Sequence, residues 1–331
     1  MARRAERIHQ PKIRLNQIFL NIMTTEQKNK IVDALELYLT KFEMSANAFV
    51  DKTGINEAYI TNMRNRSFTV SKTEIRPNWF EAVATAIGYE LHKQYWKTVF
   101  TTQTTTMLAH LQDAKDFGYT NVIIGETGSG KSYTAQLFAN ANPQHLFIIK
   151  VGSSDNLSDL IQKILDAAKI PTAKTKSKNI GAIIKYFQKL KFEGHNPMLI
   201  FDECEYVKQP TLCMMKELVD GLLKKCAVIL IGTDELTDKL DKMRKRKVEG
   251  IRQFYRRLKF TVRVLPSIDT TFKQFLNDVE DAKLRSFLQR NCDNYGELHD
   301  ALVPAMRESD RTGQALTENF VRKVLNMPEI N

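Results

Sequence analysis

The stretch that decides the fold is Gly125-Glu-Thr-Gly-Ser-Gly-Lys-Ser132, which directly follows the apolar run Val122-Ile-Ile. It matches the pattern GxxxxGK[ST] in full, and residues 133–140, which come next, are predicted to be helical. Glycines let backbone N–H groups converge on phosphate oxygens at the start of a helix, where the helix dipole favours negative charge. The residues expected to bind a nucleotide are Gly125, Glu126, Thr127, Gly128, Ser129, Gly130, Lys131, Ser132 and Tyr133.

Within this loop, Lys131 is expected to meet the β- and γ-phosphates, and the Ser132 hydroxyl to ligate Mg²⁺. A second strand, Met198-Leu-Ile-Phe-Asp202-Glu203, ends in two acids. Asp202 is expected to hold Mg²⁺ as well, and Glu203 to polarise the attacking water. The pattern therefore predicts hydrolysis of a nucleoside triphosphate.

A third strand, over residues 227–233, ends in the hydroxyl of Thr233. That hydroxyl is placed to bond the γ-phosphate or the water, and Thr233 could equally be the N-cap of the following helix.

Short β-branched runs alternate with helical stretches through the middle of the chain. The runs lie at 121–124, 146–151, 198–201, 227–231 and 260–265, and the helical stretches at 157–169, 179–191 and 211–225. This alternation predicts an α/β fold, a parallel sheet covered by helices on both faces. After Pro266 the sequence indicates only helices, over 270–290 and 296–326.

Taken together, the glycine-rich loop, the strand ending in Asp202-Glu203, the strand ending at Thr233 and the helical tail resemble the P-loop AAA+ ATPases. The resemblance implies an ATPase core over 107–267 and a helical lid over 268–331. The segment from Phe201 to Val207 is similar to the transposition ATPases of the MuB, TnsC and IstB type.

That family resemblance implies ATP and Mg²⁺ as cofactors, bound between neighbouring copies in a helical filament or ring. An arginine from the adjacent copy completes such a site, and the candidates are Arg256 and Arg257, with Arg252 behind them. In the lid, a Gly-x-x-Arg that touches nucleotide in many relatives is replaced by Gly296-Glu-Leu-His299.

Before the sheet, helical periodicity over residues 25–42, 45–52, 56–64 and 78–87 predicts an all-α domain spanning 25–92, followed by a linker over 93–106. The helices that meet at Gly54 fit a helix-turn-helix and resemble the DNA-binding domain of phage repressors. The exposed face of the second one would present Asn56, Glu57, Tyr59, Asn62, Arg64 and Arg66 to duplex DNA. A small helical module that docks a protein is the alternative.

Net charge is +11 and is concentrated in two segments. Residues 1–14 carry a net of +4, from Arg3, Arg4, Arg7, Lys12 and Arg14 against Glu6. Residues 239–259 hold ten basic and two acidic side chains. This distribution indicates a polyanion partner, with residues 1–24 acting as a basic N-terminal arm.

Three alternating lysines, Lys174, Lys176 and Lys178, are predicted to lie in a loop between two helices. Similar AAA+ proteins line an axial pore with such a loop, so these lysines are expected to contact DNA phosphates without reading the sequence. Solubility is the alternative explanation for them.

With 43% hydrophobic and 26% charged residues, the chain does not fit disordered, collagen-like or disulfide-scaffold classes. It also lacks an apolar run of membrane-spanning length. We expect a cytoplasmic, bacterial or phage-encoded ATPase that oligomerises on target duplex DNA and recruits a transposase, with hydrolysis driving disassembly. The alternatives are a replication initiator or helicase loader, and an ATP-binding helix-turn-helix regulator with little turnover.

Overall fold

The computed structural model describes residues 23–71, 73–89 and 95–328. The chain forms two compact units, Met1–Gln94 and Tyr95–Asn331. The basic arm predicted over residues 1–24, with Arg3, Arg4 and Arg7, falls almost entirely outside the described residues. Among the described residues, no helix is both long and apolar enough to span a membrane.

The first unit packs four helices and a short antiparallel hairpin around one core. Its elements are α1 (Thr25–Lys41), α2 (Ala46–Thr53), α3 (Glu57–Arg64), β1 (Thr69–Val70), β2 (Thr73–Glu74) and α4 (Pro77–Ile87). The largest fully buried side chains include Phe49, Ile60 and Phe80. Gly54 adopts the left-handed conformation, with φ of 71°, that ends α2 and starts the turn into α3. The four helices match the periodicity of the sequence, but the hairpin was not predicted, because strands of two residues carry no readable alternation.

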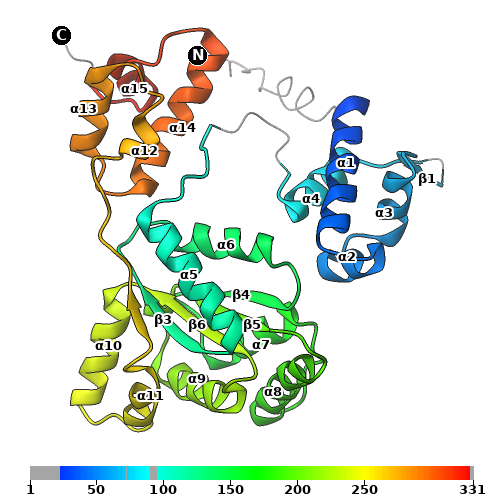
Figure 1. Cartoon of the computed structure of the whole chain (residues 1–331), viewed down its shortest axis with the longest axis vertical. Helices are drawn as coiled ribbons and strands as arrows, with labels where there is room; N and C mark the ends of the chain where they lie inside the picture. Colours follow the sequence, from blue (N-terminus) through cyan, green and yellow to red (C-terminus); the bar gives the residue numbers. More distant parts are fainter. Residues whose placement is uncertain (1–22, 72, 90–94, 329–331) are drawn as a thin grey trace, which may run out of the picture. The chain divides into compact units, whose positions relative to one another are not determined.

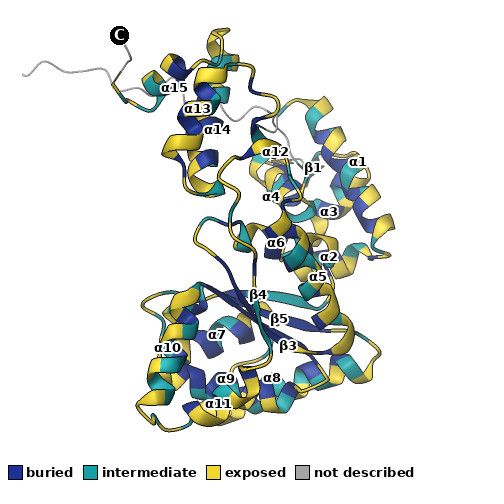
Figure 2. Cartoon of the chain, turned by 60° about the vertical axis from the view of Figure 1, so that its left-hand side comes forward, coloured by how far each residue is buried: buried dark blue, intermediate teal, exposed yellow. Residues whose placement is uncertain are grey.

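In the second unit, five parallel strands form the sheet in the order β4-β5-β6-β3-β7. The strands are β3 (Thr120–Ile124), β4 (Leu146–Lys150), β5 (Met198–Asp202), β6 (Ala227–Gly232) and β7 (Val262–Val264). Strands β3, β5 and β6 are buried along their whole length, as Figure 2 shows for β3 and β5 in dark blue. Because the strands are parallel, the loops that follow β3, β5 and β6 meet at one edge of the sheet, here called the carboxyl edge.

Helices cover both faces of this sheet (Figure 1). On one face lie α5 (Thr102–Phe117) and α6 (Lys131–Ala141), whose Met107, Leu111 and Phe138 pack against Ile123 and its neighbours. The other face carries α7 (Leu157–Ala167), α8 (Lys176–Phe192), α9 (Gln209–Leu222), α10 (Asp234–Lys245) and α11 (Ile251–Leu258). The predicted α/β fold with helices on both faces is confirmed.

After β7 the described chain is helical, as predicted, and forms its own core around Phe272, Phe287 and Leu298. Its helices, here called the lid, are α12 (Lys273–Leu276), α13 (Ala282–Asn291), α14 (Tyr295–Thr312) and α15 (Glu318–Val324). Residues Tyr95 and Trp96, at the start of the unit, pack on these helices; the Trp96 ring stacks on Phe275 at 4.7 Å between centroids.

Two boundaries differ from the sequence prediction. The segment 93–106 is not a linker throughout, because α5 begins at Thr102 after the cap Thr101. Its helical period is hidden by buried polar residues: Gln103 and Thr104 are 2% and 5% exposed, and Gln103 Nε2 donates to the carbonyls of Pro266 and Ser267.

The second difference concerns the lysine loop. Helix α8 starts at Lys176, because the Thr175 hydroxyl accepts a hydrogen bond from the Lys178 N–H at 3.3 Å. Of the three lysines only Lys174 lies in the loop, whereas Lys176 and Lys178 lie in the first helical turn.

Candidate functional site

The glycine-rich loop joins β3 to α6 at the carboxyl edge. Gly130, with φ of 84°, is the N-cap of α6, and Gly128 is also left-handed, with φ of 72°. The Gly125 N–H donates to the Gly232 carbonyl at 3.2 Å, which ties the loop to the end of β6. Left-handed glycines at the start of a helix allow backbone N–H groups to converge on one point, as phosphate binding requires.

Lys131 is the first residue of α6, and its side chain folds back over the loop. Its Nζ donates to the Gly125 carbonyl at 2.8 Å and to the Glu126 carbonyl at 2.7 Å. Burial lowers the pKa of this ammonium group, and the carboxylates of Glu205 and Asp202 act in the opposite direction. A partly buried cation among carboxylates and backbone carbonyls is suited to meeting a phosphate.

Asp202 is the last residue of β5, and Glu203 follows it. Asp202 is 6% exposed, and its Oδ1 accepts from the Glu203 N–H at 2.9 Å. Glu203 has a left-handed backbone, with φ of 59°, and its carboxylate pairs with Lys150 Nζ at 2.9 Å. Lys150 ends β4 directly opposite Asp202 in the parallel register, so the side chain proposed to polarise water is held from the adjacent strand.

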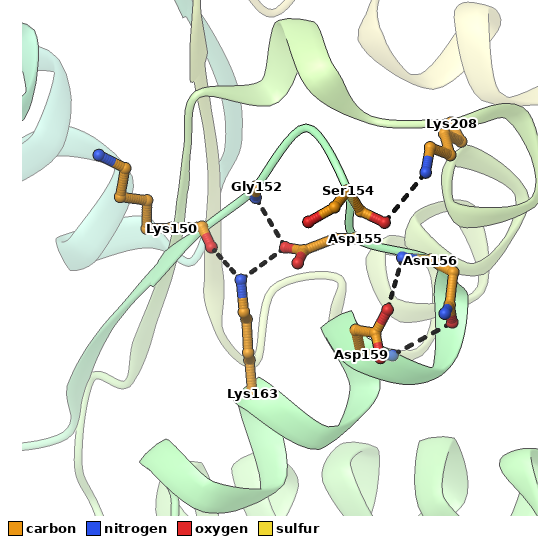
Figure 3. Close-up of polar contacts among 8 residues, drawn as sticks. All are labelled: Lys150, Gly152, Ser154, Asp155, Asn156, Asp159, Lys163 and Lys208. Carbon is orange, nitrogen blue, oxygen red and sulfur yellow. Dashed lines mark hydrogen bonds and ion pairs between the residues drawn. The ribbon is translucent and has the colours of Figure 1, made fainter.

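The backbone from which Lys150 extends is itself fixed by a cluster of polar contacts (Figure 3). Lys163 Nζ donates to the Lys150 carbonyl at 3.0 Å and pairs with Asp155 at 2.5 Å, and Asp155 accepts from the Gly152 N–H at 2.7 Å. Lys208, just after the Glu203 turn, donates to the Ser154 carbonyl at 3.1 Å. The loops that follow β4 and β5 are therefore tied together, while the Lys150 side chain points away from this cluster.

Three buried polar atoms among the described residues have no hydrogen-bond partner: Ser129 Oγ, Glu205 Oε2 and Thr233 Oγ1. Ser129 belongs to the glycine-rich loop, Glu205 to the turn after β5, and Thr233 to the end of β6. Thr233 is the N-cap residue of α10 by position, but its side chain makes no capping bond, so its hydroxyl remains available. Buried polar groups are normally paired. The two hydroxyls can donate to a ligand rich in oxygen atoms, whereas the Glu205 oxygen accepts and suits a donor or a cation.

Glu205 was not singled out from the sequence. It lies in a short 3₁₀ turn (Cys204–Tyr206), and a Cβ on Gly232 would lie 3.0 Å from its Oε2. Its position three residues after Asp202 could have indicated it, because this spacing places both carboxylates on the same turn.

The lid contributes a contact that sequence spacing did not indicate. Asn294 caps α14 by accepting from the Glu297 N–H at 3.0 Å, and it lies against the glycine-rich loop: a Cβ on Gly128 would be 2.2 Å from Asn294 Oδ1. His299, at the position expected for a nucleotide-contacting arginine, instead pairs with Asp300 at 2.9 Å and meets the Trp96 ring edge at 5.2 Å.

The remaining predicted nucleotide-binding residues lie around the same loop. Glu126, Thr127, Ser132 and Tyr133 are exposed; Glu126 Oε2 accepts from the Ile268 N–H, and the Tyr133 hydroxyl bonds the Thr98 hydroxyl. The Ser132 hydroxyl and the Asp202 carboxylate are the hard oxygen ligands that Mg²⁺ prefers, so the residues present fit this cation.

The candidate arginines lie on α11 and differ in their contacts. Arg257 Nε pairs with Asp220 of α9 at 2.7 Å. Arg256 and Arg252 are exposed and make no hydrogen bond or ion pair within the described parts of the chain. Of the three, these two have no polar partner in the described residues with which an outside group would have to compete.

The predicted DNA-contacting residues of α3 have partners inside the first unit. Arg64 forms a two-bond pair with Glu36 of α1, at 2.6 and 3.1 Å, and Arg66 contacts Asp33 and Asn29. Asn56 caps α3, Asn62 Nδ2 donates to the Ala58 carbonyl at 2.7 Å, and Tyr59 packs on Trp79. Glu57 is exposed in the first turn of α3.

Comparison with known proteins supports the assignment of the second unit. Residues 119–240 match the family model of the AAA domain. No curated protein matches the sequence of the chain significantly.

Among solved structures, the chain is similar to Cdc6p from Pyrobaculum aerophilum, with a TM-score of 0.50 and 13% identity over 75% of this chain and 72% of that one. It is also similar to the ORC2 protein of Aeropyrum pernix in its ADPNP-ADP complexes, with a TM-score of 0.50 and 16% identity over 72% of this chain and 71% of that one. At these identities the likeness concerns the fold. Residues 119–240 are thus similar to an AAA domain, and the second unit has a parallel α/β fold consistent with that of P-loop AAA+ proteins.

Proposed function

We propose that this protein binds and hydrolyses ATP and uses the bound nucleotide to assemble with further copies of itself on duplex DNA. The observation that carries the nucleotide part is the pair of partnerless buried hydroxyls, Ser129 Oγ in the glycine-rich loop that leads to Lys131 and Thr233 Oγ1 at the end of β6.

Each residue of the site has a distinct part in hydrolysis. The Lys131 ammonium neutralises the β- and γ-phosphate oxygens, and the Thr233 hydroxyl donates to the γ-phosphate or orients the water. Glu203 accepts a proton from the water that attacks the γ-phosphorus. Ser132 and Asp202 would hold Mg²⁺, which offsets the phosphate charge when it is bound.

Assembly is supported by the arginines of α11. An arginine supplied by a neighbouring copy stabilises the charge that develops during phosphoryl transfer. Because Arg257 is held by Asp220, Arg256 is the better candidate of the predicted pair.

The DNA part of the proposal is supported by the exposed lysines 174, 176 and 178 at the start of α8. A helix N-terminus carries partial positive charge, and lysines in the first turn add to it rather than oppose it. Such a region favours a phosphate, so each copy in an assembly would contact the DNA backbone without reading its sequence.

The more specific proposal is a regulator that selects target DNA and recruits a transposase. It is supported by the order of the two units, with the helix-turn-helix pattern first, and by the resemblance of residues 201–207 to transposition ATPases. A replication initiator or helicase loader is the second candidate. The likeness to Cdc6p and ORC2 concerns the fold and fits both candidates.

Electron microscopy with duplex DNA and a slowly hydrolysed ATP analogue tests the proposal. Continuous filaments on DNA are expected for the transposition regulator, and closed hexamers without DNA for a loader. Single copies under all conditions would contradict the assembly step. A turnover measurement with ATP, with and without DNA, separates both candidates from a regulator that binds ATP and hardly hydrolyses it.

A further inference from the structure

Large exposed apolar side chains gather at the edge of the sheet opposite the carboxyl edge. Phe117 and Tyr119 precede β3, Leu223 precedes β6, and Phe260 precedes β7; they are 59%, 45%, 56% and 80% exposed. Strands β6, β3 and β7 are neighbours in the sheet, so the three turns that carry these residues lie side by side. We call these four residues, with the turns that bear them, the amino-edge surface.

The turns hold one another in place. A Cβ on Gly118 would lie 2.9 Å from the Lys224 backbone, which shows how closely the first two turns approach. The Val122 N–H donates to the Thr261 carbonyl at 3.0 Å, which ties the third turn to β3. The rings of Phe117 and Tyr119 stack at 5.4 Å between centroids, with 20° between their planes. The aromatic faces are therefore presented from a fixed backbone.

Basic residues accompany the rings in all three turns. Residues 115–119, 223–225 and 259–263 contain five basic residues and one acid, Asp116. Lys224, Lys225 and Lys259 are exposed and make no ion pair among the described residues, and Lys259 Nζ lies 5.0 Å from the centre of the Phe260 ring. Lysine is depleted in the cores of protein–protein interfaces, whereas aromatic rings among cations are the usual surface for unpaired bases and their phosphates.

We propose that the amino-edge surface binds single-stranded nucleic acid. Unpaired bases would stack on Phe260 and on the Phe117–Tyr119 pair, while Lys224, Lys225 and Lys259 neutralise the backbone. Duplex DNA offers no free base faces, so this surface is distinct from the duplex contacts proposed above, and it requires no bound ATP.

The test is fluorescence anisotropy with fluorescein-labelled dT20 and rU20, using the whole chain without nucleotide. The double variant Phe117→Ala/Phe260→Ala should bind at least about tenfold more weakly, because one stacked base is worth roughly this much. The matched control is Val264→Ala, an exposed residue at the other end of β7, which should bind as the parent does. The two oligonucleotides show whether the surface prefers DNA or RNA.

A local reporter confirms where binding occurs. Phe260→Trp should lose fluorescence when dT20 is added, whereas Val264→Trp should not. Lys224→Gln/Lys225→Gln should reduce the dependence of log affinity on log salt by about 1.4, the value for two phosphates of a single strand. Thermal unfolding of each variant checks that the fold is kept.

Three outcomes would overturn the proposal: no measurable binding of either oligonucleotide by the parent, equal binding by the double variant, or equal quenching at positions 260 and 264. A loss of self-association in the double variant, measured by sedimentation, with oligonucleotide binding unchanged, would assign the surface to contact between copies instead.

Discussion

At the carboxyl edge of the sheet, buried polar atoms of Ser129, Glu205 and Thr233 are left without partners, whereas at the C-terminal end of α3 in the first unit the two arginines are already paired. Arg64 is bonded twice to Glu36, and Arg66 contacts Asp33. An unpartnered buried group costs stability until a ligand meets it. A paired surface charge must exchange one partner for another, and gains little. We therefore expect specific binding at the first region and weak, salt-dependent binding at the second.

The largest expected effect is a loss of ATP binding at the carboxyl edge, with DNA binding by the first unit unchanged. Lys131→Ala removes the ammonium group that lies over the glycine-rich loop, and ATP affinity should fall about 10²- to 10³-fold, since truncating a partly buried charged partner costs several kcal/mol. Isothermal titration with ATP and Mg²⁺ measures this. Nucleotide-free binding of duplex DNA through the first unit should stay unchanged, and a parallel loss there would mean that the variant is unfolded.

Next in size is the hydrolytic step. Glu203→Gln should retain ATP binding and lower turnover about 10²-fold, the lower end of the usual contribution of a general base. Assembled protein on DNA should then persist, as judged by sedimentation. The control is Glu235→Gln, an exposed acid of α10. If the Glu203 variant hydrolysed ATP at the parent rate, Glu203 would not be the group that accepts the proton from water.

A smaller and more direct test addresses the partnerless atoms. Ser129→Ala deletes a buried hydroxyl that bonds nothing in the described chain, so the nucleotide-free protein should gain about 1 kcal/mol, or about 2–4 °C in midpoint temperature. ATP affinity should fall a few-fold. In the matched control Thr134→Val, the lost hydroxyl bonds Thr104, and the protein should be destabilised. Destabilisation by Ser129→Ala would show that its hydroxyl has a structural partner.

The smallest effect is expected in the first unit. Glu36→Gln releases Arg64, and duplex affinity should rise about two- to fivefold with a steeper salt dependence, because an exposed ion pair holds at most about 1 kcal/mol. Anisotropy of a labelled duplex over a salt series measures this. Glu43→Gln, an exposed acid of the same unit, is the control. An unchanged affinity would mean that Arg64 does not contact DNA.

The parts of the site that the sequence revealed are those fixed by local backbone chemistry. Gly128, Gly130 and Lys131 lie within one turn, and Asp202 and Thr233 end strands whose neighbours follow from the parallel topology. Asn294 was missed because its contact with Gly128 joins residues far apart in the chain, and no short pattern records such a contact. Glu205 was missed although it follows Asp202 by three residues, because it lies after the strand end in a short 3₁₀ turn. The start of α5 was misplaced because Gln103 and Thr104 are polar but buried, which removes the amphipathic period.

The close approach of Asn294 to Gly128 has a consequence for how this protein can be divided. A fragment that stopped after β7 would keep every residue of the glycine-rich loop and the strand ends. It would lack Asn294, however, and would leave the loop more exposed to water around Gly128. We therefore expect that the shortest fragment that keeps the proposed nucleotide site intact extends into α14, so that at least the start of this helix is part of the same structural unit as the glycine-rich loop.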